Sequence, residues 1–532
     1  MANITRRQAL AGAAILPLAL QTPAFAATPK DTLVMAKQID DIITLDPGEC
    51  YELSGVEICT NLYDRLLRYE AEDVTKMVGG VANMPTVSPD GKVFTFKIKP
   101  NLKFQSGAPV TAEDCAFSLQ RVVLMDKTPA FLITQLGWTK ANVADLIKAT
   151  APDTLQFTIT ESYAPSMVMN LMTSIIASIV EKKVAMANAK DGDYGNTWLK
   201  TNSAASGAYK LVSWKANESV TLEAYPGFRL GAPTMKRVVI RHVPEPATQR
   251  LMVEKADIDI ARDLSSDQIK AVRGNKDLRI EDFPGANTWY LGLNMSDDRL
   301  KNEKVRTAMK MLVDYDGMVK SFLKGQFFVQ QSFLPVGFFA AMKYEPFKLD
   351  VAKAKALLAE AGYPNGFTIK LASNNSSPGP EIAQSIQQTM GQAGIKVEIV
   401  TADRKTVLSD YRGRKNQMTL MSWGPDYFDP HTNADTFARN TDDSDGAATK
   451  PLAWRNHWSI PDVSAETALA AKELDSAKRK SMYEVLQKKV TLEGPFVIMF
   501  QNVAEVAFRK NVSGFKLGIT EDLNFYRTAK KA

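Results

Sequence analysis

The chain has 532 residues, of which 45% are hydrophobic and 23% are charged, with 30 Gly, 26 Pro and 3 Cys. This ordinary globular composition excludes a collagen-like chain, a disulfide-based scaffold and a wholly disordered protein. The formal net charge is +6, and the basic residues are scattered among acidic ones along the whole chain. Binding to nucleic acid is therefore not indicated, because phosphate contacts require a concentrated basic stripe.

The first residues have the layout of a secretory signal peptide over 1–26. Arg6 and Arg7 precede an apolar run at 9–20, and small residues at 24–26 provide a cleavage site. This run is too short to remain in a bilayer as a spanning helix. The paired arginines resemble a Tat export signal, while an alanine in place of the usual large apolar residue leaves Sec export open. The residue directly after the cleavage site is an alanine and not the cysteine of a lipoprotein, so we expect an exported, soluble chain without a lipid anchor.

The three cysteines matter in an oxidising compartment, where disulfides form and persist. Eight residues separate Cys50 from Cys59, and the two would bridge if the intervening segment forms a loop, leaving Cys115 unpaired. We therefore consider a Cys50–Cys59 disulfide, whose formation depends on geometry that the sequence does not define. No CxxC motif or paired Cys and His spacing is present, so the cysteines indicate no metal or catalytic site.

The first half of the mature chain predicts a mixture of strands and helices. An apolar strand is expected at 33–36 and a helix at 58–67. Alternating apolar and polar residues predict a strand at 93–98, and a second short strand with a loop is expected at 103–110. Thr111 then caps a helix, because an aspartate follows three residues later in the capping-box position.

The second half contains a succession of strand, helix and strand. Asp350 is an N-cap residue for a helix that ends at Gly362. A strand at 367–371, a helix at 381–391 and a strand at 394–399 follow with short connections. This order is typical of a βαβ unit, in which the two strands lie in parallel in an α/β lobe.

Four stretches of sequence carry recognisable patterns and together span the mature chain nearly from end to end. They are the segment from Ser88-x-Asp90-Gly91 to Thr111-Ala112-x-Asp114; Ser206-Gly207-Ala208-Tyr209-Lys210-Leu211 with Trp214; Leu291-Gly292-Leu293-Asn294 with Val305-Arg306-x-Ala308 and Asp314-Tyr315-Asp316; and the alanine-rich helix from Asp350 to Gly362-Tyr363-Pro364.

In this order the four stretches resemble the extracytoplasmic solute-binding proteins of family 5, which serve peptide-type ABC importers. The resemblance implies an α/β fold of the periplasmic binding protein-like type II, cluster C. Such a fold has two α/β lobes joined by a hinge, with an extra subdomain inserted in the first lobe. The implied divisions after the signal peptide (1–26) are lobe I at 27–69, 204–286 and 501–532, the inserted subdomain at 70–203, and lobe II at 287–500.

The chain lacks the sequence patterns that common enzymes need. Its three histidines, His242, His431 and His457, lie in separate segments without zinc-binding spacing. No GxSxG elbow, Walker-type glycine loop or GxGxxG after a strand is present. We therefore expect a protein without catalytic activity, metal or cofactor, and keep a secreted hydrolase as the remote alternative.

The most informative local feature is the loop that follows the apolar strand end at 419–423. Loops beyond the carboxyl ends of strands are where α/β lobes bind ligands. The resemblance implies that Asp426 accepts the α-ammonium group of the ligand, with Trp423 and Tyr427 as aromatic residues of the cleft. The alternative is that Asp426 only makes turn hydrogen bonds, the role that we expect for Asp429.

Three further residues are candidates for the cleft. The resemblance puts Trp289 and Tyr290 where the chain crosses between the lobes, so these side chains either line the cleft or pack in the hinge. His431 stands in an Asp-Pro-His run that resembles the metal-contacting run of nickel-chelate binders. Its spacing from Trp423 differs by one residue, so we expect a plain loop histidine.

The group that would bind a ligand carboxylate is not evident from the sequence. Leu420 stands where oligopeptide binders of the family carry a basic residue. Arg404, Arg412 and Arg414 lie just upstream, and we expect each of them to face solvent.

The resemblance implies a function as the periplasmic substrate-binding component of an ABC importer. The expected ligand is a peptide or peptide-like amine bound between the lobes, and the expected partners are the membrane permease subunits. Closure around the ligand would let the permease distinguish loaded from empty protein. The alternatives within this class are an opine, a metal chelate or a sugar derivative. We expect a monomer.

Overall fold

The computed structural model describes residues 28–70, 73 and 76–532. The expected signal peptide at 1–26 lies outside the described residues. Within them, no helix combines the length and the apolar character needed to cross a membrane.

One mixed sheet of eleven strands runs through both halves of the molecule. Its order along one path is β15 (Lys396–Ala402), β14 (Thr368–Asn374), β16 (Met418–Trp423), β12 (Leu278–Leu293), β17 (Phe496–Arg509), β11 (Ile260–Ala261), β1 (Thr32–Lys37), β10 (Arg237–His242), β9 (Ser219–Ala224) and β8 (Tyr209–Lys215), with β13 (Phe327–Val329) paired to β17.

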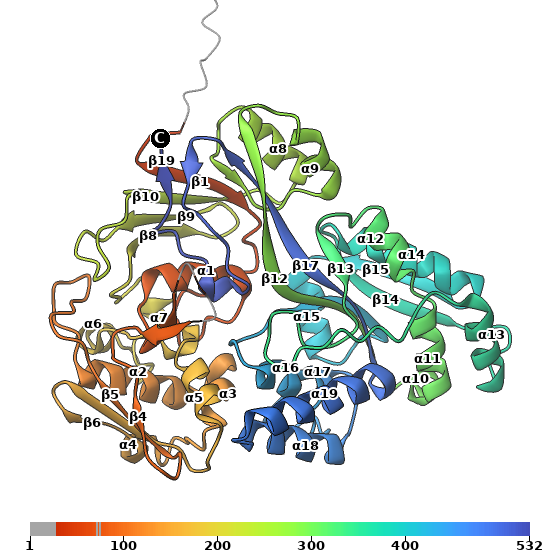
Figure 1. Ribbon diagram of the computed structural model, residues 1–532, viewed down its shortest axis with the longest axis horizontal. Coiled ribbons are helices and arrows are strands. Elements are labelled where there is room, and N and C mark those ends of the chain that lie inside the picture. Colours follow the sequence, from red (N-terminus) through yellow and green to blue (C-terminus); the bar gives the residue numbers. More distant parts are fainter. Residues whose placement is uncertain (1–27, 71–72, 74–75) are drawn as a thin grey trace, which may run out of the picture.

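The two longest strands connect the lobes. β12 and β17 pair antiparallel from Leu278 with Arg509 at one end to Gly292 with Phe496 at the other. Their register shifts between Pro284 and Thr288, because proline has no N–H to donate to the ladder and a glycine follows it. Figure 1 shows both strands passing from the lobe with red and yellow segments into the lobe with green, cyan and blue segments. This irregularity lies close to residue 287, where the sequence predicts the crossing.

Lobe I is built from the first and last parts of the chain. Its parallel strands β1, β10 and β11 lie beside β9 and β8, and its core combines Leu33 with Phe508 and Tyr526. The side chain of Asn61 ties helix α1 to the last segment, because it donates to Asn524 O and accepts from Tyr526 N at 2.8 Å each. The remaining elements of this lobe are α1 (Leu53–Leu62), α8 (Pro246–Glu254), α9 (Ser266–Val272), β18 (Val512–Ser513), the 3-10 turn η3 (Glu521–Leu523) and β19 (Lys530–Lys531).

The inserted subdomain has its own sheet and its own core. Strands β4 (Thr86–Val87), β5 (Val93–Lys97), β7 (Thr154–Thr158) and β6 (Ile147–Ala151) form the sheet. Helix α2 (Ala112–Met125) packs on it and starts with the expected capping box, in which Thr111 and Asp114 bond each other's backbone N–H. β2 (Leu67–Tyr69), at the end of the first part of lobe I, pairs with β3 (Met77–Gly79) of the subdomain. The other elements of the subdomain are η1 (Thr128–Ala130), α3 (Phe131–Thr134), α4 (Val143–Leu146), α5 (Pro165–Leu171), η2 (Ile175–Ala177), α6 (Lys182–Ala187) and α7 (Asn196–Leu199).

Lobe II contains the expected βαβ unit. β14 and β15 are parallel and in register from Thr368 with Lys396 onward, and helix α14 connects them. Asp350 caps α13 by accepting from Lys353 N at 2.9 Å. The helices of this lobe are α10 (Asp298–Lys301), α11 (Glu303–Met311), α12 (Tyr315–Lys320), α13 (Val351–Glu360), α14 (Gly379–Gln392), α15 (Arg404–Arg412), α16 (Pro430–Phe437), α17 (Leu452–Arg455), α18 (Pro461–Lys472) and α19 (Ser476–Glu493).

Two local predictions differ from the structure. The helix expected at 58–67 begins earlier, at Leu53, and ends at Leu62, after which Arg65 turns inward to donate to Thr60 Oγ1 at 2.9 Å and Asp522 O at 3.1 Å. The strand expected at 103–110 is reduced to one isolated bridge between Lys103 and Pro109, because the segment folds into a turn at a positive-φ glycine.

All three cysteines are buried free thiols, so the structure does not contain the considered Cys50–Cys59 bridge. The Cys59 thiol instead donates to Leu45 O at 3.3 Å. Cys115 lies in the core of the inserted subdomain.

Candidate ligand-binding site between the lobes

The loop from Gly424 to Asp429 connects the end of β16 to the start of α16. Asp429 caps α16 by accepting from His431 N at 2.9 Å, and its carboxylate pairs with Arg479 at 2.7 and 3.0 Å. Both side chains of this ion pair are buried, so Asp429 holds the loop in place, in agreement with its expected role in the turn. Asp426 N donates to Thr432 Oγ1 at 3.0 Å, which fixes the backbone at the residue expected to bind the amine.

The carboxylate of Asp426 faces lobe I across a small cavity. Tyr51 OH donates to Asp426 Oδ2 at 3.5 Å, and this contact joins the two lobes. Enclosure in the cavity raises the pKa of Asp426 to about 7, because burial disfavours the charged form of a carboxyl group. The residues that line the cavity are Cys50, Tyr51, Leu53, Val56, Pro129, Leu132, Ile175, Gly424, Pro425, Asp426, Glu521 and Asp522.

Two carboxyl groups of lobe I share this cavity with Asp426. Glu521 accepts from Asn287 Nδ2 at 3.3 Å, and Asp522 pairs with the buried Arg65 at 3.4 Å. Burial raises the pKa of both Glu521 and Asp522. Among the three carboxyl groups only Asp522 has a cationic partner within ion-pair distance in the described part of the chain. The arrangement therefore favours a ligand that brings a positive charge.

The lobes are in contact around this cavity, as expected for a closed cleft. Gln38 Nε2 donates to Ser376 Oγ at 3.2 Å, and Ala164 N of the inserted subdomain donates to Ala471 O of α18 at 3.1 Å. The cavity beside Asp426 measures about 30 Å³, which is room for about one or two water molecules. A peptide therefore enters only when the lobes separate or the side chains around Asp426 move.

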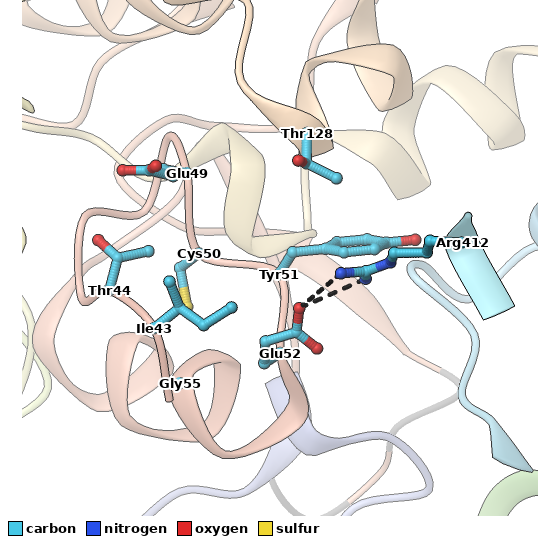
Figure 2. A pocket seen from close by; sticks show the side chains of 9 residues that line it. All are labelled: Ile43, Thr44, Glu49, Cys50, Tyr51, Glu52, Gly55, Thr128 and Arg412. Atoms are coloured by element: carbon cyan, nitrogen blue, oxygen red, sulfur yellow. Dashed lines mark hydrogen bonds and ion pairs between the residues drawn. The ribbon is translucent and has the colours of Figure 1, made fainter. Parts of the chain in front are cut away.

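In lobe I, the loop before α1 borders a second cavity with its segment from Cys50 to Glu52 (Figure 2). Arg412, the last residue of α15, reaches across to the Glu52 carboxylate at 3.4 and 3.5 Å. Figure 2 shows this pair beside the Tyr51 ring. The pair marks the boundary between lobe II and lobe I at the mouth of the cleft. Sequence reasoning missed Tyr51 and Glu52, because a single tyrosine and a single acid in a loop carry no pattern.

The other aromatic candidates lie in packed regions. Tyr290 is buried against Phe437 and Phe496, with ring centroids 5.5 and 5.9 Å apart, and Trp289 packs edge-on against Phe327 at 6.1 Å. Both residues belong to the crossing strand β12, so of the two alternatives, lining the cleft or packing in the hinge, these contacts correspond to packing. Tyr427 is buried in the core of the inserted subdomain, although it belongs to the loop of lobe II.

Trp423 and His431 flank the loop without contacting the cavity. Trp423 ends β16 opposite Thr288 and packs at the edge of a lobe II core. His431 is buried in α16, where its Nε2 lies 3.8 Å from Asp435, and burial lowers its pKa. Its surroundings are those of a structural histidine, and the described residues contain no group of three or more His, Cys, Asp and Glu side chains able to hold a metal ion.

The three arginines upstream of the loop have different surroundings. Arg412 makes the contact with Glu52, whereas Arg404 lines a larger cavity at the cleft mouth, of about 250 Å³. Arg414 is turned away from the cleft, because it stacks on Trp454 with its guanidinium carbon 3.3 Å from the ring centroid and pairs with Asp443 at 2.7 Å. Among the three, only Arg404 and Arg412 therefore lie where they could meet a bound ligand.

Two α/β lobes joined by paired strands, with a cavity at their interface that carries three carboxyl groups, define a two-lobed solute-binding protein. Residues 76–445 match the model of the bacterial extracellular solute-binding proteins, family 5, and the chain belongs to this family. The expected fold class and the expected class of binding protein, as opposed to an enzyme, are thereby confirmed.

Similar proteins cover nearly the whole chain. The probable D,D-dipeptide-binding periplasmic protein DdpA of Escherichia coli (strain K12) is 30% identical over 511 residues, which is 94% of each chain. The glutathione-binding protein GsiB of Pectobacterium atrosepticum is 25% identical over 96% of each chain. Among solved structures, the periplasmic binding protein DppA of Helicobacter pylori in complex with the peptide STSA matches with a TM-score of 0.83 and 21% identity, over 94% of this chain and 98% of that chain.

Proposed function

We propose that this protein binds a short peptide or a peptide-like amine between its lobes and delivers it to the membrane permease of an ABC importer. The observation that carries the proposal is the cavity where Asp426 of lobe II faces Glu521 and Asp522 of lobe I. A ligand ammonium group in this cavity would contact both lobes at once, and such contacts exist only in the closed form. Binding would then shift the population toward closure.

The relatives support the peptide class and the compartment. DdpA and GsiB are named as binders of D,D-dipeptides and of glutathione, and DdpA and DppA are named as periplasmic. We extend both properties to this chain, which we propose to act in the periplasm as a monomer, exported by Tat or Sec and without a lipid anchor. The permease subunits are its proposed partners.

The proposal is tested by calorimetric titration with matched pairs of ligands. Dipeptides with a free amino group should bind, whereas the same dipeptides with an acetylated amino group should not, because acetylation removes the positive charge. Asp426→Asn should weaken the free dipeptide by tenfold or more, which corresponds to about 1.4 kcal/mol. Asp445→Asn is the matched control, since Asp445 is 95% exposed in the same lobe. This variant should bind the free dipeptide with unchanged affinity.

Equal binding of acetylated and free dipeptides would reject the role of Asp426. Recovery of the dipeptides after incubation separates binding from hydrolysis. Intact dipeptides are expected, and cleaved products would favour the secreted hydrolase.

A further inference from the structure

A pocket on lobe I, outside the cavity beside Asp426, gathers four arginines from distant parts of the sequence. Arg65 and Arg68 follow helix α1, Arg229 follows β9, and Arg527 lies in the last segment of the chain. We call these four residues, with the space between them, the basic pocket. Its walls also include backbone of Gly207 and aromatic side chains, so the guanidinium groups are partly shielded from water.

The acidic residues at the basic pocket do not balance its positive charge. Arg65 forms an ion pair with Asp522 and donates hydrogen bonds to backbone oxygens. Arg229 forms an ion pair with Asp64, with N–O distances of 2.7 and 3.0 Å. Asp64 and Asp522 are therefore already committed to partners on the inner side of the pocket.

Arg68 and Arg527 have N–H groups without a hydrogen-bond acceptor among the described residues. Arg68 pairs with Glu70 at 3.1 Å, but its Nε–H is buried and has no acceptor. Arg527 makes neither an ion pair nor a hydrogen bond with its side chain among the residues that the structure describes, and its only ring contact there is with Phe525 at 5.9 Å. Within the described part of the chain, the pocket thus holds one guanidinium without an ion-pair partner and one N–H donor without an acceptor, both in a partly buried place.

This arrangement is electrostatically costly without an anion. Burial, followed by the nearby Arg68 and Arg229, lowers the pKa of Arg527. Arg229 and Arg68 also contribute, after burial, to lowering the pKa of Lys99 beside them. Partly buried like charges repel one another, and an anion among them would remove both the repulsion and the unsatisfied donors.

We propose that the basic pocket is a binding site for a small oxyanion such as inorganic phosphate or sulfate, held by Arg527 and by the Nε–H of Arg68. The pocket measures about 30 Å³ and this Nε–H is buried, so the two arginine side chains move apart to admit the anion. A planar guanidinium presents two parallel N–H groups that match the spacing of phosphate oxygens. The four arginines all belong to lobe I, so the site stays intact when the lobes open. It is separate from the cavity beside Asp426, although the Arg65–Asp522 ion pair lies between the two.

The test is calorimetric titration of the full chain with inorganic phosphate, at an ionic strength held constant with sodium chloride. Saturable binding of one equivalent is expected, with a rise in melting temperature beyond that given by chloride. Arg527→Gln should weaken phosphate at least tenfold. Arg241→Gln, which changes an exposed arginine of β10, is the matched control and should leave phosphate affinity unchanged.

Two further variants keep the test decisive. Arg68→Lys retains the charge but removes the Nε–H, and it should also weaken phosphate binding. It therefore serves as the test if Arg527→Gln fails to fold. Asp426→Asn should leave phosphate binding unaltered, which separates this proposal from the peptide site. Phosphate that acts no differently from chloride, or that binds Arg527→Gln as tightly as the unmodified protein, would overturn the proposal.

Discussion

Asp426 combines a backbone held in place by a hydrogen bond with a carboxyl group whose ionised form is disfavoured by burial. Its N–H is held by Thr432, while enclosure raises its pKa to about 7 from 3.8. Among the residues that the structure describes, only the Tyr51 hydroxyl donates to the carboxylate, at the long distance of 3.5 Å. A ligand ammonium group would supply the missing stabilisation of the charged form.

The raised pKa predicts how peptide binding depends on pH. Affinity should be highest near pH 7 to 8 and should fall about tenfold per pH unit below 7, because Asp426 must give up a proton. It should fall again above about 8, where the free amino group of the peptide loses its own proton. Calorimetry from pH 5 to 9 measures the peptide affinity at each pH. An affinity of the unmodified protein that stays constant below pH 7 would contradict the role of Asp426 in binding the amine.

The same group affects the stability of the unliganded protein in the opposite sense. A carboxyl group whose pKa is raised on folding binds protons more tightly in the folded state than in the unfolded state. The contribution of Asp426 to stability is therefore lost as the pH rises from about 4 to about 7. The ligand is expected to offset this loss, so the stabilisation by a peptide should be larger at pH 7.5 than at pH 5.

At the scale of elements, helix α15 and the loop before α1 meet at the cleft mouth with opposite charges. Arg404, Lys405 and Arg412 of α15 face Asp40, Asp41 and Glu52 across a cavity of about 250 Å³. Only Arg412 and Glu52 come within ion-pair distance among these six described residues. Because their side chains are 35% and 19% exposed, the pair should contribute only modestly.

A double-mutant cycle with Glu52→Gln and Arg412→Gln measures this contribution to ligand affinity. Each single change is expected to weaken peptide binding by about 0.2–1 kcal/mol, and the double variant should be no weaker than the worse single variant. The coupling should shrink as sodium chloride is raised. Additive effects of the two substitutions would show that the contact is not formed in the closed protein.

The elements that the sequence predicts well are those with local signals. The capping box at Thr111, the N-cap at Asp350 and the βαβ unit of β14, α14 and β15 are all present. The short strand expected with a loop at 103–110 is reduced to one bridge, because the chain turns at Gly107, whose φ is positive. The loop carrying Asp426 is recognisable from its pattern, but its partners Tyr51, Glu521 and Asp522 come from segments far away in sequence, which no local pattern connects.

At the scale of the whole molecule, the cavity beside Asp426 is too small for a peptide, and we predict that the ligand enters by separation of the lobes and not by side-chain movement alone. Gln38 and Ser376 touch across the cleft and offer a place to prevent this motion. Cross-linking a Gln38→Cys, Ser376→Cys variant with a short bis-maleimide should abolish peptide binding when the reagent is added first.

Added after the peptide, the same reagent should trap the bound ligand. The two single-cysteine variants treated in the same way are the controls, and they should bind normally, since the three natural thiols are buried. Undiminished peptide binding by the cross-linked double variant would mean that ligand reaches the site without lobe separation.

The path of the chain through lobe I has a consequence for the order of folding. The core of this lobe holds Leu33 from the first strand together with Phe508, Tyr526 and Ala529, and Asn61 bonds the backbone of the last segment. A nascent chain that has not yet released its final residues therefore lacks part of the lobe I core. Lobe II, whose strands β14, β15 and β16 are nearly all local, gains most of its contacts earlier. The protein should thus complete its fold only after synthesis ends. Because residues 496–500 of β17 pack in the cores of lobe II, a chain that ends just after residue 500 should form lobe II without a stable lobe I.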